Sequence, residues 1–218
     1  MTSPVARLTW QAGDPAGLAA DLERRLGAPP PGVDVVPWLR ESPTDAPTAA
    51  GRLVFEPVEE GATPLPPAAG SLALVGVAWA TVELDRAEWE LAQWLAPAAD
   101  EPGEAIEPHL GARVRTRATT DLPGGHVVLA EPATEGRLAA SLARDGEGPC
   151  ALYLRPAGGL DAWLAAARAR GTAVSRVAAG PFGRSVLVPG AAVAGPHVIV
   201  VEGSPPSSPA PAAGTIAP

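Results

Sequence analysis

The sequence predicts an α+β fold in which paired βαβββ modules form curved mixed sheets, with an additional βαββ module at the N-terminus. A strand–helix–strand pattern recurs three times along the chain. Each copy begins with a strand-like apolar run, continues with apolar residues at helical spacing, and ends in two or three short strand-like runs. A unit this small cannot bury its sheet alone, so we expect the copies to pack together, within the chain or across a dimer.

The N-terminal module is expected to span residues 1–60 and to start with the alternating strand VARLTWQA. Asp14 stands where a helix N-cap belongs, and Pro15 stands at the first helical position. Gly27 is placed to end that helix. Two further strands are predicted, at residues 33–39 and 52–57.

The second copy follows a Pro/Ala/Gly-rich linker at residues 61–70. Its first strand is LALVGVAWATVEL, and a helix is predicted from about Asp85, the expected cap, to Leu95. A loop, PAADEPGEAIEP, is expected to carry solvated acidic residues, Glu107 among them. Two strands and a short helix then follow, with the strands at 112–119 and 126–132.

The third copy starts with the strand CALYLRP and continues with a helix that ends at Gly171. Three short strands are predicted after it, in AVSRV, SVLVP and HVIVVE. The second and third copies together are expected to form one domain, residues 71–203. The Ser/Pro/Ala-rich tail, residues 204–218, is predicted to be disordered.

The composition narrows the classes of function. The net charge is −8 over 218 residues, which disfavours binding to nucleic-acid phosphates. The only cysteine, Cys150, cannot form an intrachain disulfide, and we expect it to be a buried, inert thiol. The start of the sequence has no signal-peptide pattern, and no apolar run approaches the ~18 residues of a membrane span. A cytoplasmic protein without membrane contact is expected.

Four segments, taken in order, carry a family resemblance: ATVELDRA, LAEPATEGRLAASLARDGEG, GLDAWLAAARARG and HVIVVE. Together they resemble modules of the vicinal-oxygen-chelate (glyoxalase-like) superfamily, and methylmalonyl-CoA epimerases in particular. The resemblance covers about residues 72–202, with a looser echo in residues 5–57. It implies two βαβββ modules around one curved sheet.

The resemblance also implies a divalent metal held by His and Glu side chains on the inner face of that sheet. The corresponding positions here hold side chains that cannot ligate a metal. We therefore expect no metal and no other cofactor. The four positions are Gly76, Val128, Ala151 and Ile199.

Residues of equal parity share one face of a strand, so polar side chains near these positions are expected to point into the same concave pocket. They are His126, Tyr153, Arg155 and His197. His126, Tyr153 and Arg155 are candidate catalytic residues, because they can move protons and bind an oxyanion without metal. His197 is a candidate ligand-binding residue. In the plainer alternative, the two histidines lie at exposed strand starts, Tyr153 is a core aromatic and Arg155 is a rim residue.

Two more groups are candidate ligand-binding residues. Arg113, Arg115 and Arg117 alternate along one strand and should present three guanidiniums on one face, as in a groove for a carboxylate or phosphate. The alternative is a solvated or edge-guarding charged face. Trp10 and Trp38 are candidates for lining a ligand cavity or, alternatively, for core packing.

The sequence leaves three functions open. The first is a metal-free module that binds a small apolar or anionic molecule in the sheet cavity. The second is a metal-independent isomerase or lyase that uses His126, Tyr153 and Arg155. The third is an interaction protein in which the N-terminal module completes a sheet across a homodimer.

Overall fold

The computed structural model describes residues 6–12, 14–28, 33–37, 52–57, 72–93, 103–119, 124–190 and 196–203. Trp38, the 61–70 linker and the 204–218 tail lie outside these described residues. The described chain forms a three-stranded sheet and an eight-stranded sheet, together with four helices. None of these helices is long and apolar enough to span a membrane.

The eight-stranded sheet is built from two βαβββ modules with the strand order β5-β6-β7-β4-β8-β11-β10-β9. The first strands of the two modules, β4 and β8, pair antiparallel at its centre, and each pairs parallel with its own module's last strand. The predicted paired arrangement is therefore present. The first module is β4 (Leu72–Ala80), α2 (Leu84–Leu91), β5 (Gly103–Glu107), β6 (Ala112–Ala118) and β7 (His126–Pro132). Helix α3 (Arg137–Asp145) leads to the second: β8 (Gly148–Pro156), α4 (Leu160–Ala169), β9 (Ala178–Gly180), β10 (Gly183–Val188) and β11 (His197–Val201).

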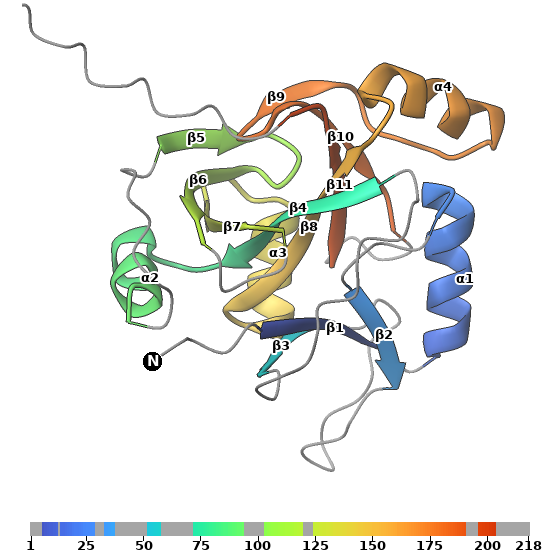
Figure 1. Ribbon diagram of the computed structural model, residues 1–218. Helices are drawn as coiled ribbons and strands as arrows, with labels where there is room; N and C mark the ends of the chain where they lie inside the picture. The colour runs from blue at the N-terminus through green and yellow to red at the C-terminus, as the bar shows by residue number, and fades with distance from the viewer. Residues whose placement is uncertain are drawn as a thin grey trace, which may run out of the picture.

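The sheet curls until its two edges approach each other. Figure 1 shows β5 and β9 lying close together, and residues of these two strands are in contact. The concave face that results is packed with apolar side chains from both modules and from α3. Leu110, Leu138 and Phe182 fill it together with the inward residues of the strands, and each of these three is at most 1% exposed.

The N-terminal module forms its own sheet, in the order β2-β1-β3, from β1 (Ala6–Ala12), β2 (Val33–Pro37) and β3 (Arg52–Pro57). Its helix α1 (Pro15–Leu26) has the predicted ends: the Asp14 side chain accepts from the backbone N–H of Gly17 at 2.9 Å, and Gly27 adopts a left-handed φ of 83°. Asp14 and Gly27 thereby satisfy backbone groups that a helix leaves unpaired at its two ends.

This module packs in cis against the outer face of the larger sheet and against α4 (Figure 1). Apolar residues of α1 and β1 share one core with Trp163, whose indole Nε1 donates to the Leu26 carbonyl at 3.2 Å. The Thr172 hydroxyl donates to the Arg25 carbonyl at 3.1 Å. Because the three-stranded sheet is separate from the eight-stranded one, the N-terminal module does not extend the larger sheet within the described chain.

Three local expectations are wrong. Residues 173–177 form no strand, because Ser175 makes isolated bonds to Leu187 in place of a ladder. Residues 103–107, expected in a loop, form strand β5. The segment is predicted as a loop because its two glutamates make it look like a solvated acidic stretch. Helix α2 begins at Leu84, so Asp85 lies in its first turn and is not its cap.

Candidate functional site

Phe182 lies at the centre of the concave face, between two of the predicted site residues. Its ring packs against Tyr153 with the centroids 4.8 Å apart, and edge-on against His126 at 5.7 Å. His126 Nδ1 lies 3.0 Å from the Val75 carbonyl oxygen, so this imidazole is tied to the backbone of β4. The structure thus brings His126 and Tyr153 to one place, as strand parity predicts, but with an aromatic ring between them.

Tyr153 also reaches a buried acid that the sequence placed in solvent. Its hydroxyl donates to Glu107 Oε2 at 3.2 Å, and the backbone N–H of His109 donates to Glu107 Oε1 at 3.0 Å. Glu107 is 0% exposed. Burial raises the pKa of this carboxyl to about 7, against smaller opposing effects of its two hydrogen bonds. The expectation of a solvated Glu107 is therefore wrong, because β5 turns this side chain inward.

A second polar contact ties the turn after β5 to the other module. His109 Nε2 lies 3.1 Å from the Ser185 hydroxyl of β10, and Nδ1 lies 3.4 Å from the Ser175 hydroxyl. Burial lowers the pKa of His109, which favours the neutral imidazole. His109 thus helps to hold the two modules together at this end of the sheet.

His197 lies on the same face but under helix α3. Its Nε2 lies 3.4 Å from the Ser141 hydroxyl, and only 3% of the residue is exposed. Burial, reinforced by the nearby charges of Arg137 and Arg144, lowers the pKa of His197 to about 4. His197 is therefore a neutral hydrogen-bonding group at pH 7.

The residues at the expected metal positions do not fit a metal. Val128, Ala151 and Ile199 are buried members of the apolar cluster on the concave face. A Cβ atom placed on Gly76 would lie 2.9 Å from Cζ of Phe182, so a side chain there would collide with that ring. Among the described residues, no three His, Cys, Asp or Glu side chains are grouped to hold a metal ion.

The three arginines of β6 project together, as predicted, on the face opposite the concave core. Each is paired with carboxylates of the protein: Arg113 with Glu131 at 2.5 Å, Arg115 with Asp85 at 2.6 Å and Glu88 at 2.7 Å, and Arg117 with Glu88. Acidic partners from α2 and β7 thus already occupy the guanidiniums expected to bind an anion.

Two further candidates lie apart from this face or at its margin. Trp10 is 3% exposed and packs in the core between the N-terminal module and the larger sheet. Arg155 lies near the end of β8, half-buried, at the ladder position opposite Ala73.

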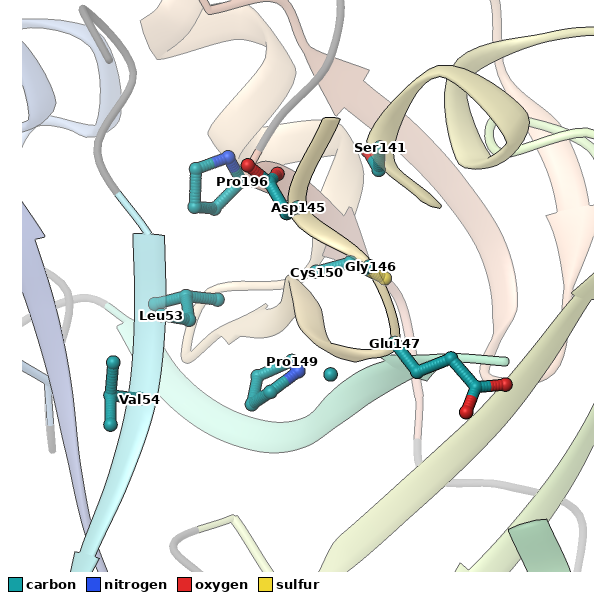
Figure 2. A pocket seen from close by; sticks show the side chains of 10 residues that line it. Leu53, Val54, Ser141, Asp145, Gly146, Glu147, Pro149, Cys150 and Pro196 are labelled. Carbon is teal, nitrogen blue, oxygen red and sulfur yellow. The ribbon is translucent and has the colours of Figure 1, made fainter. Parts of the chain in front are cut away.

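A cavity of about 240 Å³ lies elsewhere, where the N-terminal module meets the connector between α3 and β8. Figure 2 shows Leu53 of β3 on one side and the connector on the other, with Pro196 above and Pro149 below. The lining residues within the described part of the chain are Leu53, Val54, Ser141, Asp145, Gly146, Glu147, Gly148, Pro149, Cys150 and Pro196.

The polar groups of this lining are engaged by the protein. The Asp145 carboxylate pairs with Arg144, which donates from Nε at 2.8 Å and from Nη2 at 2.5 Å. Arg86, with smaller help from backbone and hydroxyl donors, lowers the pKa of Glu147 to about 2. Burial raises the pKa of the Cys150 thiol to about 12, so it stays protonated and unreactive, as the sequence led us to expect.

Sequence reasoning missed Glu107, Phe182 and the whole cavity. The pattern of GEAIE was a usable signal for Glu107. In a strand, Glu107 shares one face with Ala105, and that face can point inward. Phe182 follows a proline in a short turn, where nothing in the local pattern indicates a buried aromatic side chain. The cavity joins Leu53 to Pro149 and Pro196, which no local pattern connects.

Comparison with known proteins bears on the fold. No family model matches the sequence, and no match was found among curated proteins. Among solved structures, methylmalonyl-CoA epimerase from Mycobacterium tuberculosis is similar, with a TM-score of 0.52 at 23% identity over 61% of this chain and 89% of that chain. A hypothetical protein from Bacillus halodurans C-125 follows, with a TM-score of 0.49 at 14% identity over 64% of this chain and 99% of that one. Methylmalonyl-CoA epimerases belong to the vicinal-oxygen-chelate superfamily, and the chain has the fold of that superfamily.

Proposed function

We propose that this chain is a metal-free binding protein on the vicinal-oxygen-chelate fold, which takes up a small, largely apolar molecule. We place that molecule in the cavity between β3 and the α3–β8 connector, and not on the concave face where the sequence suggested it. The carrying observation is that Phe182 and its neighbours fill the concave face, while about 240 Å³ is open where the N-terminal module meets the larger domain.

The size and position of this cavity support the proposal. A protein cavity of about 150 Å³ already binds benzene, so this one has room for a ring and a short chain. Its walls come from three separate segments of the chain, and ligand sites are frequent where such units meet. In this proposal the N-terminal module helps to form the binding site, because its strand β3 provides one wall of the cavity.

A titration with 4-phenylbutanol followed by amide NMR tests the proposal. We expect saturable shifts at Gly146, Glu147 and Gly148, with a Kd of about 1 mM for a probe of this size. Val54→Trp, which narrows the cavity, should abolish them. Val177→Trp is the matched control, because Val177 is 44% exposed and outside the lining. Shifts that survive in Val54→Trp would place the binding elsewhere.

One observation favours a second candidate, a metal-independent isomerase or lyase that uses His126, Tyr153 and Arg155. Glu107, with its raised pKa, lies within hydrogen-bond distance of Tyr153, and such a pair suits proton transfer. Substrate could reach it only if Phe182 moved. Deuterium incorporation at the α-carbon of methylmalonyl-CoA, lost in His126→Ala and Arg155→Ala, would favour this candidate. Its absence in wild type and in Phe182→Ala would remove this reaction from consideration.

A further inference from the structure

The charged side chains that line the cavity between β3 and the α3–β8 connector are all acidic. The ten lining residues include the carboxylates of Asp145 and Glu147, and none of the ten is Arg, Lys or His. An anionic group that entered would find no cationic side chain among the ten lining residues and would lie beside two carboxylates, which Arg144 and Arg86 pair from outside the lining. The lining therefore argues against the anionic ligand that the sequence left open.

Asp145 is the carboxylate that the cavity presents to a ligand. In Figure 2 its oxygens lie beside Pro196, whereas the Glu147 side chain extends away from Leu53 and Val54. Glu147 Oε1 is also committed, because it accepts from the Thr81 hydroxyl and the Val82 N–H at 2.8 Å each. Asp145 accepts one bond at each oxygen, both from Arg144, and each carboxylate oxygen has a second lone pair.

The remaining lining suits an uncharged hydrocarbon body. Leu53, Pro149 and Pro196 surround the space in Figure 2, and Cys150 adds a neutral thiol. The Ser141 hydroxyl at the edge is already near His197 Nε2, at 3.4 Å. A ligand therefore meets apolar side chains around its body and, at one end, the carboxylate that Arg144 pairs.

Resting on the binding function proposed above, we infer that the ligand is a cationic amphiphile. Its apolar body lies between β3 and Pro149, and its protonated amine donates to Asp145. Arg144 competes for the same carboxylate, so its guanidinium sets how much negative charge a ligand meets.

Three probes with the same phenylbutyl body and different charge test this inference: 4-phenylbutylamine, 4-phenylbutanol and 4-phenylbutyrate, titrated at pH 7 into the full chain. We expect the amine to bind about 5- to 10-fold more tightly than the alcohol, as an ammonium–carboxylate hydrogen bond allows at a partly exposed site. The butyrate should bind at least about fivefold more weakly than the alcohol.

Two variants of the charged pair act in opposite directions. Asp145→Asn should reduce the preference for the amine to about twofold or less, because the carboxylate is gone. Arg144→Gln should increase that preference, because the competing guanidinium is gone. If Asp145→Asn does not fold, Arg144→Gln alone still decides, since it alters the same carboxylate while leaving it in place.

The outcomes separate this inference from the binding function. If the alcohol binds at a site sensitive to Val54→Trp and the amine has no advantage over it, the cationic ligand is wrong and the cavity remains a binding site. If none of the three probes responds to Val54→Trp, the binding function itself fails. An unchanged amine preference in both Asp145→Asn and Arg144→Gln would also overturn the inference.

Discussion

Replacing Glu107 by Gln should make the protein's stability less dependent on pH between about 5 and 8. The carboxyl of Glu107 is fully buried, and its pKa is about 7 in the folded protein against an ordinary value of 4.5. In this window the folded state holds a proton that the unfolded chain releases. The contribution of Glu107 to stability is therefore greatest below pH 4.5 and is lost as the pH rises through 7.

The difference of about 2.5 pKa units corresponds to roughly 3 kcal/mol of unfolding free energy, at 1.36 kcal/mol per unit. Gln is neutral at every pH, and its amide oxygen can still accept from the His109 N–H. His197 works in the opposite direction, because its lowered pKa destabilises the fold as the pH falls from 6.5 toward 4. That contribution is present in both proteins and cancels in their difference.

Urea unfolding followed by tryptophan fluorescence at pH 5, 6, 7 and 8 measures this difference. The stability of Glu107→Gln relative to wild type should rise by roughly 2.5 kcal/mol from pH 5 to pH 8, because part of the full effect lies below pH 5. Glu104→Gln is the matched control on the same strand, because Glu104 is exposed, and its difference from wild type should stay flat. Parallel profiles for wild type and Glu107→Gln would refute the reasoning and mean that folding does not hold a proton on Glu107.

Other changes test the packing. Gly76→Ala should destabilise the fold by about 1–3 kcal/mol, since its Cβ would lie 2.9 Å from Phe182 Cζ, and Phe182→Leu should relieve part of that cost in urea unfolding of the double variant. Cys150, whose pKa is about 12, should resist iodoacetamide at pH 8 until urea unfolds the protein; rapid native labelling by mass spectrometry would contradict its burial. Asp14→Ala should lower stability by about 1 kcal/mol through the lost helix cap, and Asp14→Asn should restore most of it. Residues 71–203 alone should aggregate, because the core shared with α1 and β1 would be exposed; a stable monomer in light scattering would make the N-terminal module an appendage.

Much of the fold was readable because its signals are local. Asp14 and Gly27 cap helix α1 at its two ends, and each cap bonds only to residues close to it in the sequence. The strand alternation that set Tyr153 and His197 on the face of Ala151 and Ile199 is equally local. The same reasoning failed at residues 173–177, because alternation cannot tell whether a neighbouring strand is available to pair.

The sequence by itself determined the repeated modules, the capped helix and the lack of ligand side chains at the expected metal positions, because period, capping and residue chemistry are properties of the chain. Tertiary structure alone decided that Phe182 fills the concave face, that Glu107 is buried against Tyr153 and that an acid-lined cavity opens beside β3. Tyr153 and Glu107 lie 46 positions apart in the sequence, and Leu53 and Pro196 lie farther apart still. Burial and electrostatic environment depend on which distant segments meet, and no local pattern carries that information.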